Sequence, residues 1–268
     1  MFLTIILLCG LACALVLMLV FKVYNWYILL AFLAGILIGV IIIALTIFIG
    51  SFFIKKEDYE KPSKFHKRAI CRATEFLLYI SRSKLMIRGL NKIPTDQQCL
   101  IITNHQSMFD SIASAWALRA FPISIIYKLS LRSKFMLGKY MHASGFIPID
   151  RSNPREGVKA INRAVEKITS GNASVLVCPE GTRSGSYEMG EFHSGSFKIA
   201  LKAKCPIVLC AIQNTCKVQK RFPFRSTNIY FDVIEVLEYE KIKDMSSQEL
   251  ADYSHKVIKE RLGELPKY

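Results

Sequence analysis

The first 54 residues constrain the fold of this 268-residue chain more than any other segment, because they contain a single charged residue, Lys22. Two uncharged apolar runs, Met1–Phe21 and Trp26–Ile54, lie on either side of it. Each run reaches or exceeds the roughly 20 residues that cross the hydrocarbon core of a bilayer. The short connection between them predicts a helical hairpin, so we expect residues 1–54 to anchor the chain in a membrane.

A cleaved signal peptide is the alternative explanation for the first apolar run. Such a peptide carries a basic segment before its apolar part and small residues at its cleavage site. Met1–Phe21 has neither a basic start nor an A-x-A site, and a second apolar run follows at once. A retained hairpin is therefore favoured. The pattern leaves open whether the hairpin crosses the bilayer or lies within one leaflet.

The distribution of charge predicts how the chain is oriented. Basic residues crowd the end of the second run: Lys55, Lys56, Lys61, Lys64, Lys67 and Arg68. By the positive-inside rule, this flank and the rest of residues 55–268 lie on the cytoplasmic side. The whole chain has 36 Lys and Arg against 21 Asp and Glu. This excess predicts contact with an anionic membrane surface, and no nucleic-acid-binding motif accompanies it.

The eight cysteines do not form a recognisable framework. No C-x-x-C pair and no Cys/His cluster with zinc spacing is present, so we expect no metal site. Several of the cysteines lie in short apolar runs, where a free thiol behaves as a small apolar side chain. A reduced, cytosolic domain is the expectation for residues 55–268.

Residues 55–268 alternate between segments with helical and with strand-like patterns. The helical segments are Phe65–Ser81, Ser107–Ala120, Arg155–Thr169, Ser196–Ala203 and Ser246–Leu262. The strand-like segments are Cys99–Ile102, Ile123–Tyr127, Phe146–Ile149, Ser174–Cys178, Ile207–Ile212 and Asn228–Leu237. Strands separated by helices predict an α/β fold, here a two-layer sandwich with a largely parallel sheet in one domain.

The segment Asn104–Asp110 reads N-H-x-x-x-x-D and directly follows the predicted strand Cys99–Ile102. On one continuous helix, His105 and Asp110 would lie about 140° apart, too far to meet. They can pair if His105 lies in the turn and Asp110 in the first turn of the next helix. Asp110 would then accept the Nδ1 proton and leave Nε2 as a general base. The alternative is an acidic residue that only stabilises a helix N-terminus.

A base of this kind needs a proton to remove. Hydrolases pair such a histidine with a nucleophilic Ser or Cys, often in a G-x-S-x-G turn, and this chain has no such turn. The base would instead activate the hydroxyl of a bound alcohol. That hydroxyl would attack a thioester directly, with both substrates bound together.

Two loops that follow predicted strands carry arginines. Arg151 follows Phe146–Ile149, and Glu180-Gly181-Thr182-Arg183 follows Ser174–Cys178. Ligands of open α/β sheets bind at such strand ends, and a guanidinium can grip a phosphate through two hydrogen bonds. Gly181 permits an unusual backbone conformation, and Glu180 is expected to hold Arg183 or Arg151 in place. The alternative is a pair of surface ion pairs, Arg151 with Asp150 and Arg183 with Glu188.

The three motifs together resemble the glycerolipid acyltransferases that acylate lysophosphatidic acid, and the resemblance covers roughly residues 85–215. It implies that His105 and Asp110 are catalytic. It also implies an acceptor-binding set made of Lys128, Arg151, Glu180, Gly181, Thr182 and Arg183. The chain departs from the family pattern at Ser130, where an acidic residue is usual, at His193, where a Lys is common, and at Leu209, which replaces a Pro. These departures leave the acceptor and the acyl-chain preference open.

The resemblance predicts transfer of a fatty acyl group to the sn-2 hydroxyl of 1-acylglycerol 3-phosphate, giving phosphatidic acid for phospholipid synthesis. It implies no cofactor, with acyl-CoA or acyl carrier protein as the co-substrate. Another lysolipid or glycerol 3-phosphate is the alternative acceptor. A lipid hydrolase is disfavoured because the nucleophile turn is absent. A non-catalytic protein that binds anionic lipid is the alternative from a different class.

Overall fold

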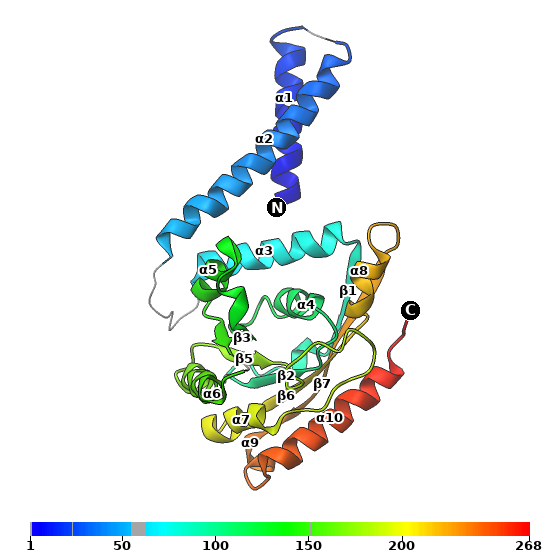
Figure 1. The fold of residues 1–268 in the computed structure, drawn as a ribbon. Coiled ribbons are helices and arrows are strands. Elements are labelled where there is room, and N and C mark those ends of the chain that lie inside the picture. The colour runs from blue at the N-terminus through cyan, green and yellow to red at the C-terminus, as the bar shows by residue number, and fades with distance from the viewer. Residues whose placement is uncertain (1, 23, 55–62, 151) are drawn as a thin grey trace. The chain divides into compact units, whose positions relative to one another are not determined.

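The computed structural model describes residues 2–22, 24–54, 63–150 and 152–268 (Figure 1). The chain divides into two compact units, Met1–Lys56 and Glu57–Tyr268. Each unit has its own internal packing and is described separately below.

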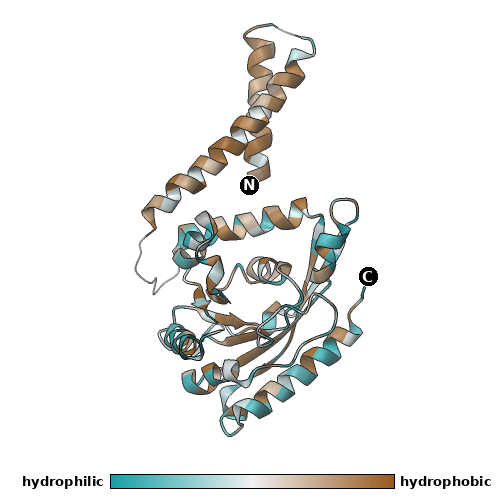
Figure 2. Ribbon diagram, in the orientation of Figure 1, coloured by the Kyte–Doolittle hydropathy of each residue, from teal (hydrophilic) through white to brown (hydrophobic). Residues whose placement is uncertain are grey.

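The first unit is a pair of apolar helices, α1 (Phe2–Leu19) and α2 (Tyr27–Gly50), followed by the short 3-10 helix η1 (Ser51–Phe53). Both α1 and the continuous segment Tyr27–Phe53 are long and apolar enough to cross a membrane, by length and composition. Figure 2 shows that both helices are mostly hydrophobic along their length. A helix without a polar face is expected where the surroundings are themselves apolar.

Small residues form the contact between α1 and α2. The buried residues of these two helices are Gly10 and Ala14 on α1, and Gly35 and Gly39 on α2. A Cβ atom built on Gly35 would lie 2.7 Å from the Cα of Gly10. Glycines four residues apart let two helix backbones approach closely, as in many membrane helix pairs. The hairpin therefore depends on the absence of side chains at these positions.

The second unit contains a seven-stranded sheet with the strand order β1-β7-β6-β2-β5-β3-β4. The strands are β1 (Ser83–Arg88), β2 (Leu100–Thr103), β3 (Ile123–Lys128), β4 (Ile147–Ile149), β5 (Ser174–Val177), β6 (Ile207–Gln213) and β7 (Thr227–Leu237). Strands β2 to β6 are parallel to one another, whereas β7 is antiparallel to β6 and β1 is parallel to β7. The ends of β2 to β6 therefore meet at one side of the sheet, which we call the carboxyl edge.

Helices cover both faces of this sheet (Figure 1). The helices α3 (Lys64–Ile80), α4 (Phe109–Ala117) and α8 (Val218–Arg221) pack on one face, and α6 (Pro154–Thr169), α7 (Lys198–Ala203) and α10 (Ser247–Glu264) on the other. Two shorter helices, α5 (Phe135–Ala143) and α9 (Tyr239–Ile242), complete the unit. Alternate residues of β2 point to opposite faces: Ile101 lies in one apolar cluster, and Leu100 and Ile102 lie in the other.

The α/β class, the largely parallel sheet and the preceding apolar helical pair confirm the predicted fold. The sheet carries helices on both faces, which adds a layer to the expected two-layer sandwich. The reason is visible in β2 and β5, where every residue is buried, so neither face is free to meet water. Strand β1 was not expected from the sequence; it is an edge strand whose residues alternate between half-buried and exposed.

Candidate active site

His105 and Asp110 lie side by side at the carboxyl edge, where β2 turns into α4. His105 follows β2 in the turn, and Asp110 is the second residue of α4, as the pairing required. The Nδ1 atom of His105 lies 2.7 Å from Oδ2 of Asp110, and both residues are buried. Within the described residues, nothing hydrogen-bonds to Nε2 of His105. The geometry thus leaves one ring nitrogen held and the other available.

Further donors hold the carboxylate of Asp110 in place. The backbone N–H of Ser107 donates to Oδ2 at 2.7 Å, and the hydroxyl of Thr215 donates to Oδ1. Thr215 comes from the turn that follows β6, so two separate strand ends fix this carboxylate. A carboxylate with both oxygens engaged has few alternative rotamers, and it therefore fixes the orientation of the His105 ring.

Asn104 connects the turn to the neighbouring strand β6. Its side-chain amide donates to the carbonyl of Ile212 at 2.9 Å, and its side-chain oxygen accepts from the N–H of Ile212 at 2.8 Å. The side chain therefore satisfies the backbone of β6 beyond the point where the β2 ladder ends at Thr103. The structure therefore gives a reason for the Asn before His105, which the sequence alone does not.

Glu180 holds the backbone of His105. Its Oε1 accepts from the N–H of His105 at 2.6 Å, and its Oε2 accepts from the N–H of Gly190 at 2.9 Å. Glu180 is buried, and this burial raises the pKa of its carboxyl, against the opposing effect of the two N–H donors. Its position links the turn after β2 to the loop formed by residues 179–193, which follows β5.

The loop 179–193 is also docked on the same turn through its own backbone. The N–H of Ser184 donates to the carbonyl of His105, and the N–H of Gly185 donates to that of Gln106, both at 3.0 Å. Gly181 has a φ of +70°, a conformation that favours glycine. A Cβ atom there would lie 3.2 Å from the ring of His193. His193, one of the departures from the family pattern, therefore packs beside Gly181 within the loop.

The predicted contact between Glu180 and Arg183 is not formed. Both oxygens of Glu180 accept backbone N–H groups, and Arg183 makes no ion pair with Glu180 or Glu188 within the described residues. Arg183 is exposed, one residue before Ser184, and its guanidinium is free to meet a ligand. Thr182 beside it is exposed as well.

The two remaining predicted residues do not join this cluster. Arg151 lies outside the described residues. Lys128 is the exposed last residue of β3, also at the carboxyl edge, but β5 lies between β3 and β2. Adjacent strands are separated by about 4.8 Å, so Lys128 starts roughly 10 Å from His105 across the sheet. Asp150, which the surface-ion-pair alternative matched with Arg151, accepts hydrogen bonds from the backbone and hydroxyl of Ser152.

Sequence reasoning missed a buried polar cluster beneath the site. The side-chain amide of Gln106 donates to Oε1 of Gln213 at 3.0 Å, and the hydroxyl of Thr215 lies 3.3 Å from Oε1 of Gln106. Gln213, Asn214 and Thr215 directly follow the apolar part of β6. A polar triplet at a strand end is the same signal that identified the Glu180 loop, so it could have been found.

The buried cysteines of the second unit are poor nucleophiles. All eight cysteines are free thiols. Burial raises the pKa of Cys99 to about 11 and that of Cys205 to about 12, and it also raises the pKa of Cys216, next to Thr215. These thiols are protonated at neutral pH. Among the described residues, no group of His, Cys, Asp and Glu is arranged to hold a metal ion.

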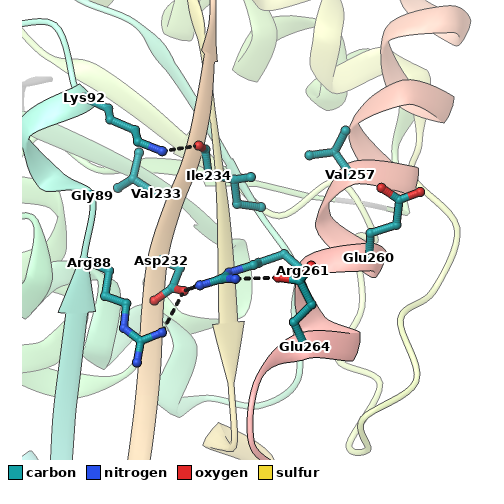
Figure 3. A pocket seen from close by; sticks show the side chains of 10 residues that line it. All are labelled: Arg88, Gly89, Lys92, Asp232, Val233, Ile234, Val257, Glu260, Arg261 and Glu264. Carbon is teal, nitrogen blue, oxygen red and sulfur yellow. Dashed lines mark hydrogen bonds and ion pairs between the residues drawn. The ribbon is translucent and has the colours of Figure 1, made fainter.

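A cavity of about 480 Å³ lies away from His105 (Figure 3). It is lined by residues of β1, β7 and α10, and β1 ends there in the direction opposite to β2. The buried carboxylate of Asp232 accepts hydrogen bonds from Nε and Nη2 of Arg261 at 3.0 and 2.6 Å. The side chain of Lys92 donates to the carbonyl of Ile234 at 2.6 Å. The Lys92 and Arg261 side chains that line the cavity are thus already hydrogen-bonded within the protein.

Comparison with known proteins shows which family the site-bearing segment resembles. Residues 84–213 match the family model described as Acyltransferase. A chloroplastic 1-acyl-sn-glycerol-3-phosphate acyltransferase from Brassica napus is 33% identical over 136 residues, which cover 50% of this chain and 39% of the relative. A probable 1-acyl-sn-glycerol-3-phosphate acyltransferase from Mycoplasma pneumoniae is 31% identical over 159 residues, 57% of each chain. The matches thus span about half the length of these curated relatives.

The fold has a solved counterpart. The crystal structure of the 1-acyl-sn-glycerophosphate (LPA) acyltransferase from Thermotoga maritima superposes with a TM-score of 0.67 and 20% sequence identity, over 98% of this chain and 96% of that one. This likeness confirms the fold, and the family model and the named relatives confirm the resemblance to the glycerolipid acyltransferases. The segment that carries His105, Asp110 and the Glu180 loop thus lies within residues 84–213, which match the acyltransferase family model.

Proposed function

We propose that this protein transfers a fatty acyl group from a thioester to the sn-2 hydroxyl of 1-acylglycerol 3-phosphate and so forms phosphatidic acid. The observation that carries the proposal is the His105–Asp110 pair, whose Nε2 side has no partner among the described residues. The pair lies at the carboxyl edge beside a loop with an exposed arginine, which suits an alcohol that bears a phosphate.

The reaction follows from this geometry. Nε2 of His105 removes the proton of the sn-2 hydroxyl as its oxygen attacks the thioester carbonyl carbon. The tetrahedral intermediate collapses, the carbon–sulfur bond breaks, and the imidazolium returns its proton to the leaving thiolate. Asp110 accepts the hydrogen bond from Nδ1–H of His105 and stabilises the imidazolium while it exists. No acyl-enzyme is formed, in keeping with the protonated cysteines described above.

The names of the relatives support the choice of acceptor. The Brassica napus and Mycoplasma pneumoniae relatives, and the human 1-acyl-sn-glycerol-3-phosphate acyltransferase alpha at 28% identity, are named for the same acceptor. We propose that Arg183, Arg151 and Lys128 bind its phosphate, and that Gly181 and Thr182 shape the loop around it. Glu180 acts as a positioning residue. The donor is acyl-CoA or acyl carrier protein, consumed as a co-substrate without a cofactor.

We further propose that α1 and α2 hold the protein in a membrane, with residues 55–268 on the cytoplasmic side. The length and apolarity of both helices support membrane insertion. The basic flank after the second helix supports the orientation. A lysolipid acceptor stays in the bilayer, so an enzyme held at the same surface meets it without extracting it into water.

The test is acyl transfer by the full chain reconstituted in lipid vesicles, with a panel of acceptors. The panel contains lysophosphatidic acid, glycerol 3-phosphate and a zwitterionic lysolipid. Each acceptor is tested with two acyl donors, acyl-CoA and acylated acyl carrier protein. His105→Ala should remove nearly all transfer without changing the thermal melt. His255→Ala on α10 is the matched control and should retain it.

Each result of this panel decides something. Phosphatidic acid formed by the unmodified chain and not by His105→Ala fixes both the reaction and the acceptor. Transfer to another acceptor keeps the mechanism and directs attention to Ser130, His193 and Leu209. Full activity of a folded His105→Ala protein would refute the mechanism. Absence of transfer with every acceptor and donor would leave a lipid-binding role.

A further inference from the structure

A short loop outside the active site exposes aromatic rings among basic residues. The segment 217–226, which we call the aromatic loop, reads K-V-Q-K-R-F-P-F-R-S. Phe222 is 49% exposed and Phe224 is 86% exposed. The loop carries four cations, Lys217, Lys220, Arg221 and Arg225, and no acidic residue. A phenyl ring that is almost fully exposed has an apolar surface that the described part of the chain does not cover.

The aromatic loop is held in a defined shape. The N–H of Arg225 donates to the carbonyl of Arg221 at 2.8 Å, and Nε of Arg221 donates to the carbonyl of Ser226 at 3.0 Å. The guanidinium of Arg82 reaches the carbonyls of Pro223 and Phe224 at 3.3 and 3.4 Å. Backbone groups on both sides of the rings are thus fixed, so the fold presents Phe224 to its surroundings.

A second exposed apolar group lies beside the loop. Arg82 follows the last turn of α3, where Tyr79 is 64% exposed and Ile80 is 41% exposed. Figure 1 shows the turn after α8 next to this end of α3, in agreement with the Arg82 contacts. Apolar side chains from two elements and a set of cations therefore form one surface.

This surface is connected to the active site through short stretches of chain. Thr215, whose hydroxyl binds Asp110, lies two residues before the aromatic loop. Within the loop, the side-chain amide of Gln219 lies 3.3 Å from the sulfur of Met108, two residues before Asp110. The aromatic loop therefore lies close to the His105–Asp110 pair, both along the chain and through the contact of Gln219 with Met108.

We propose that the aromatic loop and the last turn of α3 form a membrane-contact surface on the catalytic unit, which binds an anionic bilayer. Lysine and arginine are attracted to anionic head groups, and aromatic rings settle at the level of those head groups. A bilayer accepts rings from an exposed turn, whereas a protein partner would need a matching pocket. Contact here would turn the carboxyl edge toward the surface. The proposal concerns binding alone and stands apart from the reaction proposed above.

The test places a fluorescent reporter at the tip of the loop. Phe224→Trp is introduced into the full chain, which is reconstituted in vesicles of phosphatidylglycerol and phosphatidylcholine with or without bromine on the acyl chains. The unmodified chain provides the background from Trp26 and Trp116. Tyr253→Trp is the matched control, because Tyr253 is also an exposed aromatic residue but belongs to α10 on the other face of the sheet.

The Phe224→Trp protein should show a blue-shifted emission and lose most of it to brominated lipid, whereas the emission of the Tyr253→Trp protein should change little. Adding Lys220→Gln and Arg225→Gln to Phe224→Trp, or omitting phosphatidylglycerol, should reduce the quenching. Equal quenching at 224 and 253 would overturn the proposal. So would an emission at 224 that ignores brominated lipid and responds to an added acidic protein such as acyl carrier protein, because the surface would then be a protein-docking site.

Discussion

Glu180 is a buried carboxyl that joins two stretches of the chain. It accepts the N–H of His105 from the turn after β2 and the N–H of Gly190 from the loop after β5. Removing Oε1 would leave the buried N–H of His105 unpaired, which costs about 1–3 kcal/mol. Glu180 therefore determines where the backbone of His105 lies, although its side chain does not contact the imidazole.

The raised pKa of Glu180 predicts a specific pH dependence of stability. The folded chain holds this proton more tightly than the unfolded chain, whose Glu titrates near its ordinary value of 4.5. The stabilisation from Glu180 is thus complete below that value and is lost as the pH rises through the folded pKa. Glu180→Gln lacks this dependence. Thermal melts of both proteins between about pH 4 and pH 7 should show the wild type losing stability relative to the variant.

The comparison with Glu180→Gln cancels every titrating group that the two proteins share. The variant also loses one acceptor, but that loss is independent of pH and only offsets the two curves. A constant difference in melting temperature across the range would contradict the raised pKa.

Arg183 should affect acceptor binding more than the chemical step. Its guanidinium is exposed at the site, and a charge-assisted hydrogen bond contributes about 1.5–3 kcal/mol. Arg183→Ala should therefore raise KM for lysophosphatidic acid by about 10- to 100-fold and leave kcat nearly unchanged, because the phosphate is bound equally in the ground and transition states. Arg119→Ala, an exposed arginine beyond the end of α4, is the matched control. A loss in kcat alone would assign Arg183 to the chemistry.

Single residues of the site differed in how far they could be predicted. His105 and Asp110 were placed correctly relative to each other because they are close in sequence and a strand–turn–helix pattern surrounds them. The partners of Glu180 could not be predicted, since they are backbone groups brought together by folding. The contact of Thr215 with Asp110 joins positions 105 residues apart, and such a long-range pairing cannot be predicted from a single sequence.

At the scale of the element, the pair α1 and α2 depends on glycine. Gly35 and Gly39 lie on the face of α2 that meets α1, and a Cβ on Gly39 would lie 2.9 Å from the Cα of Ile6. A backbone atom cannot move aside as a flexible side chain can. Larger residues at these positions would therefore push the two helices apart.

Gly35→Leu should separate the helices and expose Cys9, which lies half-buried against α2. The rate at which a membrane-permeant maleimide labels Cys9 in detergent micelles should rise. Ala34→Leu is the matched control, because Ala34 is exposed on the same helix and its labelling rate should stay at the wild-type value. An unchanged rate in Gly35→Leu would show that the close contact is not required.

Most elements of the sheet were predicted from their apolar runs, and the exceptions have physical causes. β2, β5 and β6 are fully buried, so their sequences are continuous apolar segments with clear limits. β1 is an edge strand with Lys84, Met86 and Arg88 on alternate positions, and such a mixed segment is hard to separate from a loop. The antiparallel direction of β7 was not predictable, because pairing direction depends on the connection and not on composition.

At the scale of the whole molecule, the proposed orientation predicts which parts of the chain are accessible from each side of a membrane. If both helices cross the bilayer, the short connection between them lies on the side opposite to the catalytic unit. A cysteine in place of Tyr24, which is 70% exposed, should then react with an impermeant maleimide in intact cells. Ser130→Cys on the catalytic unit should react only after the cells are opened.

The two substitutions serve as controls for each other. Labelling at both positions only after opening would mean that the hairpin enters and leaves the bilayer on the cytoplasmic side. Labelling of Ser130→Cys in intact cells would contradict the orientation.

The order of the contacts along the chain has a consequence for biosynthesis. Every contact between α1 and α2 lies within the first 50 residues, so this pair can form while the ribosome is still translating the rest. The His105–Asp110 pair is completed much later in synthesis. Glu180 is added 75 positions after His105, and Thr215 is added 105 positions after Asp110. A nascent chain would therefore reach the membrane before its active site exists. A ribosome that stalls before Thr215 would leave an anchored protein without an assembled catalytic centre.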